Sequence, residues 1–157
     1  MITQRDIAVA VLAALAMLGA VVLADSVAKP VMGSTVWNWN TLKAEPMKFG
    51  ARREVFQGRT ATLDLLACHI TTLNPGQAPH DAHHHPEEEL LVVKEGTLDV
   101  MQNGVTNRAG PGAIIFQASN QEHGLRNSGD VPATYYVFKW FSPGTLKTNQ
   151  NKSVSQF

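Results

Sequence analysis

Two histidines separated by one residue, with a glutamate four residues later, are the part of this chain best suited to chemistry. In an extended chain, residues i and i+2 share a face, so His83 and His85 point one way and His84 points the other. Glu89 has the same parity and opens an apolar run. Two imidazoles and a carboxylate suit a divalent transition metal such as Fe, Mn, Ni, Cu or Zn.

A fourth ligand must come from elsewhere in the chain, and His123 is the only histidine that follows the group at 80–85. It lies between Glu122 and Gly124, at the start of an expected strand. The competing interpretation is that residues 83–89 form a solvated loop of acidic and basic side chains that binds no metal.

The remaining polar residues near this cluster are expected to have other roles. His80 is a candidate gate or supporting group beside the site. Cys68 is expected to be buried in a strand, and His69, which faces the other way, to be a sheet histidine rather than a ligand. Glu87 and Glu88 are expected on a solvated face rather than beside the ligands.

Short runs of β-branched and aromatic residues, bounded by turn residues, occur from residue 33 onward. Asn103-Gly104 is the strongest hairpin signal among these turns. No helical pattern of 12 residues interrupts the runs, so an all-β antiparallel sandwich or barrel is predicted. The expected strands are 68–73, 89–93, 97–101, 105–108, 113–116, 125–127 and 133–141, with weaker candidates at 36–39 and 54–57.

The histidine segment resembles the first motif of the cupin family, G-x5-H-x-H-x3,4-E-x6-G. His83, His85, Glu89 and Gly96 have the spacing of the motif, whereas Gly76 precedes His83 by seven residues, one more than the motif has. Cupins are small jelly-roll barrels, also called double-stranded β-helices.

The second cupin motif, G-x5-P-x-G-x2-H-x3-N, is also matched in spacing, starting at Gly112. Ala118 replaces its proline and Asn120 its second glycine, while His123 and Asn127 occupy the last two positions. Asparagine is the non-glycine residue that best tolerates a positive φ, so this turn is expected to keep its shape. The resemblance covers about residues 60–140.

The resemblance implies a single-domain cupin whose metal ligands are His83, His85, Glu89 and His123. Cupin metal sites support dioxygenation, decarboxylation, isomerisation and hydrolysis, so an enzyme acting on a small molecule is the leading interpretation. The alternatives are a non-catalytic binder with a structural or ligand-anchoring metal, and a metal-free barrel that pairs with a partner protein. No catalytic residue is assigned.

Residues outside the motifs suggest further contacts. On the strand 133–141, one parity of the aromatic residues must line the barrel and the other must face outward. Lys139 and Arg126 lie near the expected mouth, where a surface role is favoured over holding an acidic substrate. Trp37 and Trp39 share one face of the expected strand 36–39, so they cover the barrel or form a homodimer contact.

The N-terminus reads as a separate segment. Residues 7–24 are 18 consecutive uncharged residues followed by small-x-small cleavage patterns, which is typical of a signal peptide. A membrane anchor and a buried helix are the alternatives. The body is therefore expected to be exported, either periplasmic or extracellular. The expected divisions are 1–28, signal peptide or anchor; 29–59, N-terminal strands; 60–141, cupin barrel; and 142–157, a polar flexible tail.

Composition narrows the classes of partner. The chain has 157 residues, and its 13 Lys and Arg balance its 13 Asp and Glu. A neutral chain has no basic face for a phosphate backbone, so nucleic acid is not an expected partner and a small molecule is. One cysteine excludes an internal disulfide and a cysteine-based zinc site.

Overall fold

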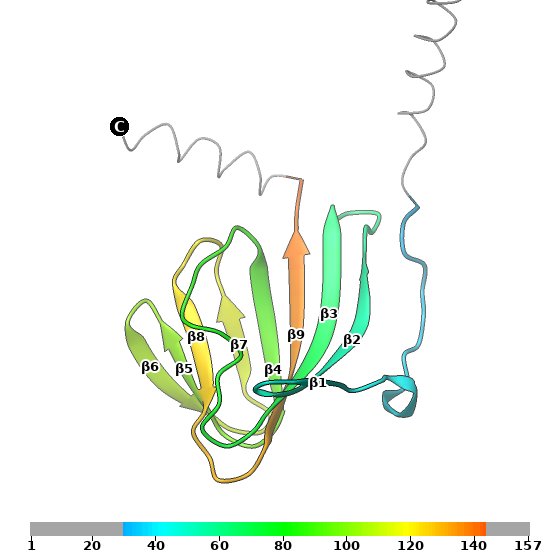
Figure 1. Ribbon diagram of the computed structural model, residues 1–157. Helices are drawn as coiled ribbons and strands as arrows, with labels where there is room; N and C mark the ends of the chain where they lie inside the picture. The colour runs from blue at the N-terminus through cyan, green and yellow to red at the C-terminus, as the bar shows by residue number, and fades with distance from the viewer. Residues whose placement is uncertain (1–29, 144–157) are drawn as a thin grey trace, which may run out of the picture. The chain divides into compact units, whose positions relative to one another are not determined.

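The computed structural model describes residues 30–143, which form two antiparallel sheets (Figure 1). The six-stranded sheet has the order β1-β2-β3-β9-β4-β7, and the three-stranded sheet has the order β6-β5-β8. The strands are β1 (Glu45–Met47), β2 (Gly50–Gly58), β3 (Leu65–Leu73), β4 (Glu88–Glu95), β5 (Leu98–Gln102), β6 (Val105–Ala109), β7 (Ile114–Gln117), β8 (His123–Asn127) and β9 (Ala133–Phe141).

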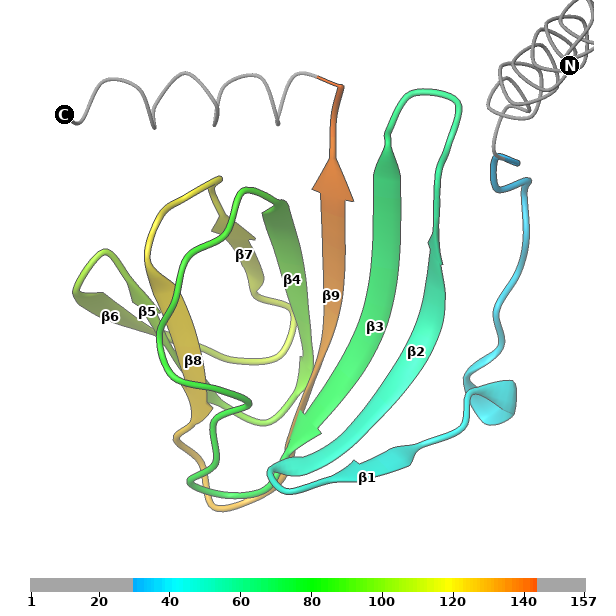
Figure 2. The same cartoon turned by 45° about the horizontal axis from the view of Figure 1, so that its top comes forward.

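The predicted all-β antiparallel fold is confirmed in this part of the chain. In Figure 2, β5, β6 and β8 lie on one side and the long strands β2, β3 and β9 on the other. The only helical element among residues 30–143 is a 3-10 turn, η1 (Trp39–Thr41), so no helix there is long and apolar enough to cross a membrane. The predicted signal peptide or anchor and the tail from residue 144 lie outside the described residues.

The alternation predicted for residues 133–141 is also confirmed. β9 pairs with β3 along its whole length, from Leu65 opposite Phe141 to Leu73 opposite Ala133. Tyr135, Val137 and Lys139 line the barrel interior, while Tyr136 and Phe138 face the other side of the sheet. β9 lies between β3 and β4, so the side chains on both of its faces lie near the centre of the six-stranded sheet.

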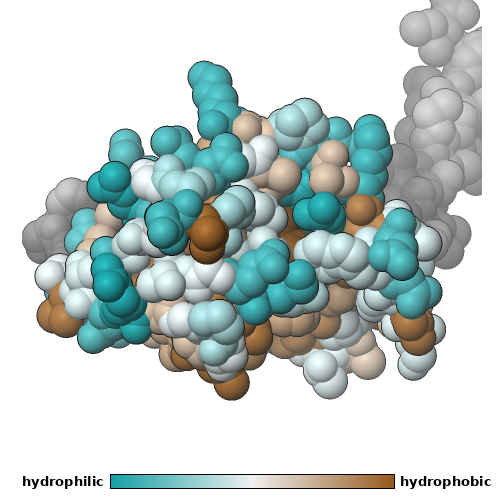
Figure 3. Space-filling model, turned by 90° about the horizontal axis from the view of Figure 1, so that it is seen from below, coloured by the Kyte–Doolittle hydropathy of each residue, from teal (hydrophilic) through white to brown (hydrophobic). Residues whose placement is uncertain are grey.

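Apolar residues between the two sheets form the core. Seven of its members have an exposed fraction of 2% or less: Leu73, Leu91, Val93, Leu98, Val100, Ala133 and Tyr135. Each leucine or valine side chain among them contributes about 1.5–3 kcal/mol through its removal from water. Exposed hydrophobic residues occur elsewhere, but the face in Figure 3 shows them interspersed with hydrophilic ones.

Cys68 is buried in β3, as predicted, with 3% of its surface exposed. Burial, followed by the negative charge of Glu54, raises the pKa of its thiol to about 11. The cysteine is therefore a small apolar residue of the sheet and stays protonated at neutral pH.

The motif residues that are not ligands fix the turns. Gly96 has a φ of 80°, and a Cβ there would lie 2.4 Å from the Cα of Ala133, so only glycine fits. Asn120 has a φ of 57°, which confirms that asparagine takes the positive-φ position usually held by glycine. The second motif therefore keeps its turn despite the substitution.

Asn127, the last residue of the second motif, ties three segments together. Its side chain is fully buried, and its Nδ2 donates hydrogen bonds to the carbonyls of Leu73 at 3.0 Å and Val131 at 2.8 Å. Its Oδ1 accepts a hydrogen bond from the backbone N–H of Gly129. The role of this asparagine is thus to hold the end of β8 against β3 and the following turn.

The expected strand 36–39 was wrong. Residues 36–38 have no regular structure, and Trp39 begins η1. The Trp37 ring packs 4.5 Å from that of Phe56, and the Trp39 ring lies 6.5 Å from that of Tyr136. The two tryptophans thus pack their rings on the outer face of the six-stranded sheet, with Trp37 still 40% exposed, and this packing requires no strand pairing. β1 was not predicted at all.

Candidate metal centre

Two loops distant in sequence are joined by backbone hydrogen bonds at the histidine cluster. His83 forms an isolated antiparallel bridge with His123, the first residue of β8, through N–O contacts of 3.0 and 2.8 Å. The carbonyl of His85 accepts a hydrogen bond of 2.8 Å from the N–H of Asn120. The two motif segments are therefore fixed to each other before any ligand binds.

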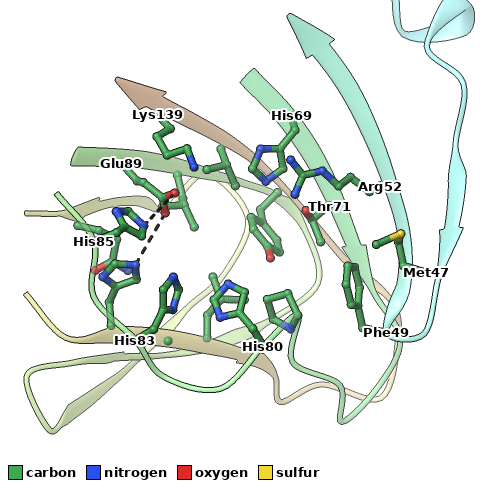
Figure 4. Close-up of a pocket in the computed structure, with 18 residues that line it drawn as sticks. Met47, Phe49, Arg52, His69, Thr71, His80, His83, His85, Glu89 and Lys139 are labelled. Atoms are coloured by element: carbon green, nitrogen blue, oxygen red, sulfur yellow. Dashed lines mark ion pairs between the residues drawn. The ribbon is translucent and has the colours of Figure 1, made fainter. Parts of the chain in front are cut away.

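Three of the predicted ligands form one cluster. His83, His85 and His123 each offer a nitrogen, and these three atoms all lie within 4.8 Å of one another. Glu89, the second residue of β4, lies beside them: its Oε1 is 3.4 Å from Nε2 of His85, and its Oε2 is 4.0 Å from Nε2 of His123. All four predicted residues are thus brought together. Figure 4 labels three of them, His83, His85 and Glu89.

Hydrogen bonds to backbone carbonyls orient two of the imidazoles. Nδ1 of His123 lies 2.8 Å from the carbonyl oxygen of Gln121, and Nδ1 of His85 lies 3.1 Å from that of Glu87. A carbonyl only accepts, so each Nδ1 must carry the proton. Each Nε2 then presents its lone pair toward Glu89 and the cluster, which is the arrangement of a metal-ligating histidine.

The donor set fits a divalent transition metal. Among residues 30–143, Nε2 of His123 and Nδ1 of His83 are buried without a hydrogen-bond partner. An unsatisfied buried polar atom costs about 1–3 kcal/mol, and coordination would remove that cost. Burial, and then the neighbouring histidines, lowers the pKa of His83. The ring therefore stays neutral, which is the form that binds a metal.

The other histidines lie outside the cluster. His84 is exposed and does not line the cavity, in keeping with the predicted alternation. The ring of His80 lies 4.1 Å from that of His83, edge to face, at the cavity wall. His69 is a sheet residue that also lines the cavity, on the opposite face of β3 from Cys68.

The expectation that Glu87 and Glu88 face solvent was wrong. The Glu87 side chain is only 17% exposed, and its carboxylate lies 3.3 Å from Nδ1 of His85 and 3.9 Å from Nζ of Lys139. Glu88 accepts a hydrogen bond of 2.9 Å from the indole N–H of Trp140. The contacts with Lys139 and Trp140 depend on β9 lying next to β4, which the local sequence does not reveal.

A cavity of about 390 Å³ opens beside the cluster inside the barrel. Its lining includes Lys139, so the surface role expected for this lysine was wrong. Arg126 is exposed and donates a hydrogen bond to the carbonyl of Gly76 at 2.9 Å, so its expected surface role is confirmed. Arg52 on β2 lines the cavity and was missed, because the adjacent Arg52 and Arg53 give the strand no alternation that would tell its inner face from its outer one.

Comparison with known families decides the classification. Residues 69–139 match the sequence profile of the Cupin domain. The chain carries a cupin domain. The matched segment contains both cupin motifs and all four predicted ligands, and its fold is the jelly-roll barrel of that family. No curated protein matches the chain.

Solved cupin structures share the fold at low sequence identity. An RmlC-like cupin from Shewanella frigidimarina has a TM-score of 0.58 at 16% identity, over 73% of this chain and 96% of that one. A predicted oxalate decarboxylase from Thermotoga maritima has a TM-score of 0.54 at 18% identity, over 68% of this chain and 99% of that one. A sugar phosphate isomerase from Silicibacter pomeroyi has a TM-score of 0.54 at 18% identity, over 69% of this chain and 77% of that one.

Proposed function

We propose that this cupin binds a divalent transition metal through His83, His85, His123 and Glu89 and uses it to convert a small molecule inside the barrel. The observation that carries the proposal is the cluster of three histidines, which includes two buried nitrogens without a partner and lies beside a carboxylate. The adjoining cavity of about 390 Å³ is large enough for a small metabolite.

The chemistry of the donor set limits the metal without choosing it. Three imidazoles and a carboxylate suit Fe, Mn, Ni, Cu or Zn, and a metal held in this way supplies a Lewis-acid or redox centre to a bound substrate. The carbonyl oxygens of Gln121 and Glu87 hold two of the imidazole rings in the ligating orientation. This orientation is set by contacts within the chain itself.

Two further residues of the cavity wall would act on the substrate. Burial and the negative charge of Glu89 raise the pKa of Tyr135, so its hydroxyl keeps its proton at neutral pH and donates a hydrogen bond rather than acting as a base. Lys139 is the cross-strand neighbour of Glu89 and places a positive charge beside the cluster. Leu91, Val137 and Leu125 supply the apolar part of the wall.

Elemental analysis of protein purified without a histidine tag tests the metal. We expect about one transition-metal ion per chain, and metal-free protein that fails to take up any of the five metals would contradict the proposal. Catalysis is tested separately. Metal-loaded and chelator-treated protein are each incubated with a panel of small metabolites, and the metabolites are followed by mass spectrometry. A ligand that is bound but recovered unchanged would identify a non-catalytic binder instead.

Export of the protein is part of the proposal. The uncharged segment 7–24 and the small residues that follow it support a signal peptide or an anchor. N-terminal sequencing of protein from its native host should begin near residue 25 or 29, or the chain should be found in the membrane fraction. Intact chain in the cytosol would contradict this.

A homodimer remains a proposal as well. Trp37 is 40% exposed although its ring packs on Phe56, which leaves an aromatic surface for a second subunit. Light scattering should give twice the chain mass at micromolar concentration. Substitution of Trp37 with Ser should shift the distribution toward monomer, and a wild-type monomer would refute the proposal.

A further inference from the structure

A row of polar side chains crosses the inner face of the six-stranded sheet. Arg52 on β2 is opposite Thr71 on β3, and Thr71 is opposite Tyr135 on β9. All three line the cavity. Positions inside a barrel are normally filled by apolar side chains, and arginine is seldom placed there. The Arg52 side chain is 38% exposed. The row therefore has the character of a binding surface rather than of a core.

Arg52 is available to a ligand in the cavity. Its Nε forms an ion pair with Glu54, whose side chain is 64% exposed. No hydrogen bond or ion pair within residues 30–143 engages its two Nη groups. Figure 4 shows the guanidinium beside His69 and Thr71, on the other side of the cavity from His83 and His85. A guanidinium placed in this way can bind a carboxylate through two hydrogen bonds.

The charges around the cavity favour an anion. Arg52 and Lys139 are positive, and Glu89 is the only acidic residue of the lining. The charge of Glu89 is directed to the histidine cluster. Glu54 and Glu87, which pair with Arg52 and Lys139, do not line the cavity, so a ligand inside it meets the two cations rather than their partners. Burial, and then the charge of Arg52, lowers the pKa of His69 to about 4, so this ring is neutral at pH 7 and offers a hydrogen bond without adding charge.

The architecture of the wall favours a carboxylate over a phosphate. Phosphate sites in proteins typically use a helix N-terminus or a run of backbone N–H groups. The backbone of the wall is instead engaged in the pairing of β2, β3, β9 and β4, and the only helical element in residues 30–143 is the turn η1. One guanidinium flanked by a hydroxyl and an imidazole matches a planar carboxylate better.

We infer that the ligand of this cavity is a small carboxylate, with its carboxylate held by Arg52 and its other end at the histidine cluster. The inference rests on the function proposed above and deepens it by naming the substrate class. Thr71 and His69 flank the carboxylate, while Lys139 lies beside the cluster end of the ligand. Arg52 is a specificity-determining residue in this arrangement, and the metal ligands do not depend on it.

The test is calorimetric binding of succinate to the metal-loaded protein, with succinamide as the uncharged analogue and inorganic phosphate as the alternative anion. Succinate should bind at least about 10-fold more tightly than succinamide or phosphate. Arg52→Gln should weaken succinate binding by about 10- to 100-fold, the range for hydrogen bonds to a charged group. Arg52→Lys should recover only part of this loss, because it keeps the charge without the planar fork.

Arg53→Gln is the matched control, because Arg53 is the next residue of the same strand but lies 4.7 Å over the ring of Trp39 on the outer face. It should leave succinate affinity unchanged. Equal binding of succinate and succinamide, tighter binding of phosphate, or equal losses in Arg52→Gln and Arg53→Gln would each overturn the inference. Metal content is measured in every sample. Wild type that holds metal but ignores succinate refutes this inference alone, whereas wild type that holds no metal refutes the proposed function.

Discussion

The two faces of the six-stranded sheet are made by the same strands but have opposite chemistry. The inner face carries Arg52, His69 and Lys139 toward the cavity. The outer face carries residues adjacent to these in sequence, such as Cys68 and Phe138, close to the rings of Trp37 and Trp39. Because successive side chains of a strand point to opposite faces, the charged lining of the cavity and the aromatic packing surface lie on the two faces of one sheet.

The difference shows where stability and function are located. The outer face is covered by aromatic rings and by two cations, Arg53 and Lys94, that lie 4.7 and 4.4 Å from the ring of Trp39. Nε of Arg53 is nevertheless buried without a hydrogen-bond partner. The inner face carries Arg52 and Lys139 and adjoins the histidine cluster, where Nδ1 of His83 and Nε2 of His123 are buried without a partner. Substitutions on the two faces should therefore have separable effects.

The largest expected effect is on metal binding at the histidine cluster beside the inner face of the sheet. His83→Ala, His85→Ala, Glu89→Ala and His123→Ala should each lower metal affinity by more than the about 10- to 100-fold typical of a supporting residue. His84→Ala should keep its metal, because that side chain is exposed. Metal stoichiometry of the five variants checks this. Loss of metal in His84→Ala together with retention in His83→Ala would show that the ligand assignment is wrong by one residue.

The next effect concerns the apolar floor of the inner face. Leu91 is 2% exposed and belongs to the core cluster, so Leu91→Ala should lower the free energy of unfolding by about 2–5 kcal/mol. Ile114, on the neighbouring strand β7, is 70% exposed, and Ile114→Ala should change it by less than about 0.5 kcal/mol. Urea denaturation measures both. Equal losses would place Leu91 outside the core.

His69 makes the inner face sensitive to acid. Burial lowers its pKa to about 4 in the folded chain, whereas the unfolded chain has the ordinary value of 6.5. The unfolded state therefore binds a proton that the folded state does not, and stability should fall as the pH drops from 6.5 to 4. His69→Gln should make the unfolding free energy of chelator-treated protein less dependent on pH across that window. An unchanged slope would show that His69 is not responsible.

The smallest expected effect is on the outer face. Trp39→Ala removes a ring contact with Tyr136 and two cation–ring contacts. We expect a loss of about 1–2 kcal/mol in the free energy of unfolding, with metal content unchanged. Thermal melts and elemental analysis of the same sample measure both quantities. Loss of metal in this variant would mean that the two faces are coupled and would break the comparison.

Much of the fold and the position of the candidate site could be predicted because the signals are local. Turn residues bounded the strands, and β9 was placed with both ends correct. His83, His85 and Glu89 could be placed on one face because an extended chain has a period of two residues. The turn at Asn120 could be predicted because asparagine tolerates a positive φ. The segment 36–39 misled because its aromatic residues favour strands yet pack as rings on a sheet that already exists.

The sequence by itself determined that His83, His85 and Glu89 share a face and that Gly96 and Asn120 form turns, since backbone periodicity and φ preferences act over a few residues. His123 was assigned to the cluster by the resemblance to the second cupin motif. Only the tertiary structure decided that Arg52 and Lys139 face the cavity and that Glu87 lies near Lys139. The positions of Lys139 and Glu87 depend on β9 pairing with β4, and that of Arg52 depends on β2 pairing with β3. Strand order and register arise from burial of the whole barrel, so no local pattern encodes them.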